Sequence, residues 1–124
     1  MMKKLILNLS LVCLSLTLFS FIYNSAHELS GIWSFNINEA PEGYNEGTIE
    51  IIEKNGSLQG EMITGSGTFP MNNLKVSSDT LTYDLKVSSH LLQAILIQVK
   101  DSIAGKIITP QGDLVITGKR VKNN

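Results

Sequence analysis

The chain has 124 residues, a formal net charge of −1 and one cysteine, Cys13. This length accommodates one domain. The basic residues are scattered apart from Lys119, Arg120 and Lys122, which disfavours nucleic acid as a partner. A domain formed downstream of Cys13 has no disulfide, so burial and strand pairing must stabilise it.

The first 26 residues have the layout of a secretory signal peptide. Lys3 and Lys4 precede an uncharged, mainly apolar run from Leu5 to Ile22, and cleavage is expected after Ala26. The run of 18 residues also suits an uncleaved membrane anchor with its lysines on the cytoplasmic side. Both interpretations export the remainder to the periplasm or the extracellular space, and the membrane is contacted only through residues 5–22 if cleavage fails.

Residues 27–30 are expected to form an N-terminal stub, followed by a single all-β domain over 31–122. Apolar and polar residues alternate between turn signals there, and we find no stretch with the period of a helix. Asn55-Gly56 is a strong hairpin signal, because a type I′ turn needs positive φ at both positions. Pro70 predicts an irregular fourth strand, since proline donates no ladder hydrogen bond. The expected strands are 31–38, 47–54, 57–64, 68–76, 80–87, 92–99, 102–109 and 113–121.

An internal repeat relates residues 57–64 (SLQGEMIT) to residues 102–109 (SIAGKIIT). It is too short for a solenoid and fits one sheet built from two similar halves. Gly60 and Gly105 occupy the middle of these two strands, where glycine weakens pairing unless the strand bends. We interpret them as corners of a small barrel rather than as phosphate-binding residues, because no helix start follows either one.

Eight strands with short links predict a single antiparallel up-and-down β-barrel whose last strand pairs with its first. The links 38–46, 65–67 and 88–91 then lie at one end, the mouth, and the tight turns lie at the other, the closed end. Gly31 and Trp33 begin the first strand at the closed end, and closure of the barrel places Arg120 beside Trp33.

The segment Gly31-Ile32-Trp33, with Arg120 near the end of the last strand, resembles the calycin superfamily of lipocalins, fatty-acid-binding proteins and avidins. In lipocalins a Gly-x-Trp motif begins the barrel, and an arginine from the last strand packs over that tryptophan. Leu58-Gln59-Gly60 is similar to part of the third strand of avidin. The resemblance covers residues 29–122 and extends to small exported bacterial lipocalin-like barrels, mostly of unassigned function. It implies that Gly31, Trp33 and Arg120 close the barrel.

The sequence departs from two of these groups. Lipocalins place a helix after the eighth strand, and this sequence has none there. Avidins line their biotin site with several tryptophans, whereas Trp33 is the only tryptophan of this sequence. Biotin binding is therefore not carried over from the resemblance.

We find no residue set that predicts catalysis or metal binding. His90 lies in a link at the mouth without a cysteine, a second histidine or spaced carboxylates. The serines lie in no nucleophile elbow, and the carboxylates alternate with apolar residues, as outward-facing positions do. An enzyme, with no site to name, is the third and least favoured hypothesis, and no cofactor is expected.

The interior is therefore the candidate site, and an eight-stranded barrel is either filled by side chains or holds one small ligand. Tyr44, in the 38–46 lid, or Tyr83 would orient a hydrophobic ligand. The ligand-binding candidates are Tyr44, Tyr83, Phe35, Met62, Leu85 and Ile97. The alternative is a filled barrel that acts as a protein-interaction or inhibitor module through its loops or through the stub from His27 to Ser30.

The expected inward set is almost wholly apolar. The sequence leaves the register of the strands 68–76, 92–99 and 113–121 undetermined by one residue. A shift of one residue would exchange the inward and outward faces of those strands. The set comprises Trp33, Phe35, Ile37, Ile49, Ile51, Leu58, Met62, Leu74, Val76, Leu81, Tyr83, Leu85, Ile95, Ile97, Val99, Ile103, Ile107, Leu114 and Ile116.

Overall fold

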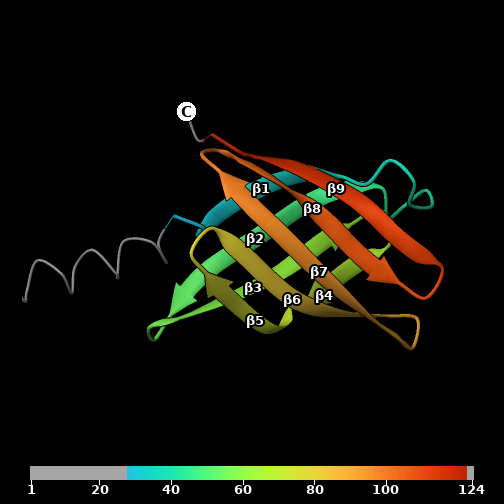
Figure 1. Cartoon of the computed structure of the whole chain (residues 1–124), viewed down its shortest axis with the longest axis horizontal. Helices are drawn as coiled ribbons and strands as arrows, with labels where there is room; N and C mark the ends of the chain where they lie inside the picture. The colour runs from blue at the N-terminus through green and yellow to red at the C-terminus, as the bar shows by residue number, and fades with distance from the viewer. Residues whose placement is uncertain (1–27, 123–124) are drawn as a thin grey trace, which may run out of the picture.

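The computed structural model describes residues 28–122; the expected signal peptide and His27 lie outside these residues. The described chain forms nine antiparallel strands in one sheet (Figure 1). No helix within it is long and apolar enough to cross a membrane. The strands are β1 (Gly31–Asn36), β2 (Glu46–Lys54), β3 (Ser57–Thr64), β4 (Gly67–Pro70), β5 (Asn72–Ser77), β6 (Thr80–Val87), β7 (His90–Val99), β8 (Ser102–Thr109) and β9 (Gly112–Arg120).

The sheet curls into a nearly closed barrel because its first strand pairs with its last. The spatial order is β4-β3-β2-β1-β9-β8-β7-β6-β5, so β1 lies between β2 and β9. Trp33 of β1 is opposite Arg120 of β9. The expectation of an all-β antiparallel up-and-down barrel is confirmed, and sequence neighbours are also spatial neighbours around the wall (Figure 1).

The expectation of eight strands is wrong, because the segment expected as one strand over 68–76 forms two. β4 pairs with β3 and ends at Pro70, whereas β5 pairs with β6. Between them the Met71 amide donates a hydrogen bond of 2.9 Å to the Gly60 carbonyl. A register shift follows at 72–75, where Asn73 has a φ of +54°. The bent segment thus crosses from one wall to the other and brings the two edges of the sheet together.

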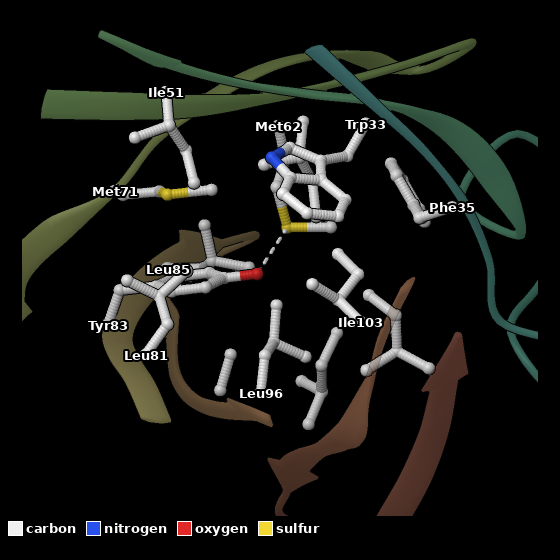
Figure 2. Close-up of a cluster of buried hydrophobic side chains, with 14 of the residues drawn as sticks. Trp33, Phe35, Ile51, Met62, Met71, Leu81, Tyr83, Leu85, Leu96 and Ile103 are labelled. Atoms are coloured by element: carbon white, nitrogen blue, oxygen red, sulfur yellow. Dashed lines mark hydrogen bonds between the residues drawn. The ribbon is translucent and has the colours of Figure 1, made fainter. Parts of the chain in front are cut away.

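The core is filled by the inward residues of seven strands. The largest fully buried side chains include Trp33, Phe35, Leu81 and Tyr83, and Figure 2 shows them gathered in the barrel interior. The inward faces expected for residues 31–37, 80–87 and 102–109 are confirmed: Ile37, Leu85, Ile103 and Ile107 are all buried with them.

The inward face expected for the strand at 92–99 is wrong by one residue. Ala94 and Leu96 are buried, whereas Ile97 and Val99 are 46% and 65% exposed and lie on the outer face. The strand is apolar on both faces, so its alternation does not specify a register. Leu96 is paired with Gly105 of β8, where the missing side chain lets the backbones of the two strands approach closely.

The two mid-strand glycines of the repeat lie where chain segments approach closely. A Cβ at Gly105 would lie 1.8 Å from the carbonyl oxygen of Ile95, and one at Gly60 would lie 2.6 Å from the sulfur of Met71. Neither position accommodates a side chain without movement of its neighbours. This geometry agrees with their interpretation as corners of the barrel.

Candidate ligand-binding site

The mouth of the barrel contains a cavity of about 590 Å³, which we call the cup. Residues from six strands and from three connections line it. Most are apolar or aromatic, and the polar ones come from the connections and from the strand ends beside them. The lining comprises Ile37, Glu39, Ala40, Pro41, Tyr44, Met62, Thr64, Phe69, Leu85, Val87, Ser88, His90, Leu92, Ile107, Thr109, Pro110, Gln111, Gly112, Asp113 and Leu114.

One wall of the cup is the connection between β1 and β2, and backbone hydrogen bonds hold it in place. Ile37 N–H donates to the Asn45 carbonyl at 2.7 Å, and Tyr44 N–H donates to the Pro41 carbonyl at 3.0 Å. The Ser66 amide of the next turn donates to Gly43 at 3.0 Å. The lid is thus bonded to the β3–β4 turn rather than free to swing over the opening.

The lid presents an aromatic pair to the cup. The ring of Tyr44 lies 6.0 Å from that of Phe69 on β4, with the planes inclined by 37°. Such tilted pairs contribute on the order of 0.5–1.5 kcal/mol beyond their buried area. Sequence reasoning missed Phe69, because the register shift near Asn73 changes which residues of the bent segment face inward: Phe69 and Met71 before it, Leu74 and Val76 after it.

The base of the cup is a contact between Met62 of β3 and Tyr83 of β6. The Tyr83 hydroxyl donates a hydrogen bond of 3.3 Å to the sulfur of Met62, drawn as the dashed line in Figure 2. Met62 lines the cup, whereas Tyr83 is 1% exposed and does not. Burial also raises the pKa of the Tyr83 phenol far above its ordinary value of about 10.

The closed end of the barrel is sealed by Trp33, Arg120 and the residues just before β1. The Arg120 guanidinium lies 4.2 Å from the centroid of the Trp33 ring, where the closed-barrel topology predicts it. Trp33 Nε1 donates to the Leu29 carbonyl at 3.1 Å, and Arg120 Nη1 donates to the Ser30 carbonyl at 2.7 Å. Arg120 Nη2 donates to the Glu28 carbonyl.

Residues 28–30 therefore form a strap across the closed end, and Leu29 is only 1% exposed. The part of the stub that the structure describes is packed against its own barrel. Docking of a partner through the stub, one of the alternatives given above, stays a prediction.

The structure separates the six sequence-predicted ligand residues into three groups. Tyr44, Met62 and Leu85 line the cup. Phe35 and Tyr83 belong to the filled core beneath it. Ile97 is on the outer face of β7, so its assignment to the site is wrong, and Leu92 of the same strand lines the cup instead.

The ionisable side chains around the cup are few. Glu39 lies on the lid, His90 begins β7, and Asp113 is 3.6 Å from Lys106 in an exposed ion pair. Within 28–122 no three His, Cys, Asp or Glu side chains lie close enough to hold a metal ion together. The arrangement is an apolar depression with a polar rim, which suits non-covalent binding of an apolar molecule.

No family model and no curated protein matches the chain. Among solved structures, the barrel is similar to the crystal structure of a mutant of the fluorescent protein UnaG, with a TM-score of 0.54. The two sequences are 11% identical, and the match covers 78% of this chain and 99% of that chain. At this identity the likeness shows the fold alone, an antiparallel β-barrel.

Proposed function

We propose that this chain is an exported calycin-like barrel that binds one small hydrophobic molecule in the cup. The cup carries the proposal: its volume of about 590 Å³ lies within the range of roughly 300–1,000 Å³ typical of small-molecule sites. Its wall is mostly apolar, and backbone hydrogen bonds hold its lid in place. The likeness to another calycin-like barrel supports the fold in which such a site is built.

Export is the second part of the proposal, and the sequence of residues 1–26 supports it. The predicted role is binding rather than catalysis. Tyr44 and Phe69 would cover one side of the bound molecule, and Leu85, Leu92 and Leu114 would contact it from the barrel wall.

The first test is native mass spectrometry of the protein purified from an exporting host, before and after solvent extraction. We expect an adduct of a few hundred daltons that disappears on extraction, and a protein mass that corresponds to cleavage after Ala26. A ligand-free protein that also fails to bind the neutral fluorescent probe N-phenyl-1-naphthylamine would contradict the binding function.

A matched pair of variants locates the bound probe. Leu92→Trp places an indole in the cup, whereas Ile97→Trp places one on the outer face of the same strand. We expect Leu92→Trp to weaken probe binding by at least tenfold and Ile97→Trp to leave it unchanged. Equal binding by the two variants would show that the probe is not in the cup.

A further inference from the structure

We propose that Met62 and Tyr83 set the maximum length of the ligand, so that the cup selects a short, single-chain amphiphile whose apolar end reaches Met62. This inference rests on the function proposed above and specifies the ligand class of the same site. The ligand would occupy the half of the barrel nearer the mouth, whereas side chains fill the half nearer the closed end.

The cup ends at a common depth around the wall. On β6, Val87 and Leu85 line it, whereas Tyr83, the next inward residue, does not. On β9, Leu114 lines it and Ile116 does not. The side chains one step deeper are fully buried, with Tyr83 at 1% and Ile116 at 0% exposure. The boundary is therefore a layer of side chains rather than one protruding residue.

Met62 and Tyr83 contact each other at the bottom of the cup, and they come from the two walls that the bent segment connects. Tyr83 comes from β6 and Met62 from β3, the two strands bridged by the bent segment of β4 and β5. The phenol is directed across the interior to the sulfur of Met62, and the rings of Trp33 and Phe35 occupy the space nearby (Figure 2). A packed interior of this kind leaves no channel for a chain to continue downward.

The rim determines which end of an amphiphile enters. The deep contacts, Met62, Leu85 and Ile107, are apolar and at most 3% exposed. The rim carries Glu39, Ser88 and Gln111 from the connections and His90 from the start of β7. A linear amphiphile is therefore buried with its chain downward and its polar group in water, and methylenes beyond the depth of the cup stay outside.

This geometry predicts a break in affinity as the chain lengthens. Each methylene that enters the cup strengthens binding about fourfold, since burying one CH₂ contributes about 0.8 kcal/mol. Once the chain end reaches Met62, further methylenes add nothing. The experiment is displacement of N-phenyl-1-naphthylamine by linear primary alcohols from hexanol to tetradecanol, with the dissociation constant plotted against chain length.

Variants of β3 test whether Met62 determines the chain length at which the affinity stops rising. We expect Met62→Ala to deepen the cup and to move the break by two or more methylenes, and the milder Met62→Val to move it in the same direction. Leu58→Ala makes a similar truncation on the same face of β3 near the closed end, so the break should stay in place. Tyr83→Phe retains the ring and should also leave the break unchanged. Thermal unfolding verifies that each variant is folded.

The outcomes separate the two proposals. If the probe itself does not bind, the proposed function fails and this inference fails with it. If the probe binds in the cup but no alcohol displaces it, the function stands and this inference is wrong. If the wild-type affinity continues to rise fourfold per methylene through tetradecanol, the function stands and the length limit is wrong. If the break exists but remains in place in the folded Met62 variants, Met62 does not form the floor.

Discussion

Tyr83 is a titratable residue that lies fully buried in the core of the barrel. Its hydroxyl is buried in the barrel, and its hydrogen-bond partner is the thioether of Met62, a weak acceptor. The phenol is therefore stable inside the barrel in its neutral form, and ionisation would leave an unpaired charge there. This is why burial raises its pKa.

Tyr83 should make the protein sensitive to alkaline pH. Below about pH 10 the phenol is protonated in both states and contributes no pH dependence. Above that pH the unfolded chain releases the proton while the folded chain retains it, so the free energy of unfolding falls as the pH rises. We expect an additional fall of about 1.4 kcal/mol per pH unit between roughly pH 10 and 12.

Urea unfolding across this pH range measures the effect. Tyr83→Phe should abolish the additional slope, whereas Tyr44→Phe, in the partly exposed lid, should retain it. Identical pH slopes in the wild type and in Tyr83→Phe would show that the phenol titrates normally in the folded protein.

At the scale of the element, the internal repeat encodes a strand together with its turn. The matched segments coincide with β3 and β8. Thr64 at the end of β3 donates its hydroxyl hydrogen to the Gly67 carbonyl and accepts from the Ser66 amide, both at 3.1 Å. Thr109 at the end of β8 makes the same pair of bonds to Gly112 and Gln111, at 2.7 and 3.2 Å.

Both turns are therefore expected to lose stability when the threonine hydroxyl is removed. Thr64→Val and Thr109→Val keep the side-chain shape and should each lower the free energy of unfolding by about 1 kcal/mol. Thr117→Val on the exposed outer face of β9 is the control and should have little effect. A loss in one turn but not in the other would show that the repeat is not energetically equivalent in its two copies.

The elements also show why the sequence predicts some faces and not others. Leu81, Tyr83 and Leu85 alternate with polar residues, so only one register buries them, and this register was predicted correctly. In β7 both faces are apolar, so the local pattern does not specify which face is buried. Phe69 was missed because the register shift near Asn73 changes which alternate residues face inward: odd-numbered residues before the shift and even-numbered residues after it.

For the molecule as a whole, Arg120 connects the parts of the chain that close the barrel. Its side chain covers the Trp33 ring of the first strand and lies 3.2 Å from Asp101 of the β7–β8 turn. It also donates to the carbonyls of the strap at Glu28 and Ser30. The resemblance of Trp33 and Arg120 to the calycin motif predicted this pairing, but a local reading of the sequence did not reveal the strap, which depends on closure of the whole barrel.

Replacement of Arg120 by lysine should weaken this closure although the charge is retained. Lysine lacks the planar guanidinium that stacks on an indole and donates in several directions at once. We expect a loss of about 1–2 kcal/mol in the free energy of unfolding, measured with urea. Lys119→Ala, at an exposed neighbouring position of β9, should cost much less. Equal midpoints for the two variants would contradict a closing role for Arg120.

The strap also determines how the barrel faces any surface to which it is tethered. Glu28 lies at the closed end, and the amide of Val121 is bonded to the Ile32 carbonyl at the same end. A bilayer anchor, a fusion partner or a resin joined directly at Glu28 or Lys122 would therefore depart opposite the cup. The opening would point outward into the surrounding fluid, so the protein would sample dissolved molecules rather than extract them directly from the surface that holds it.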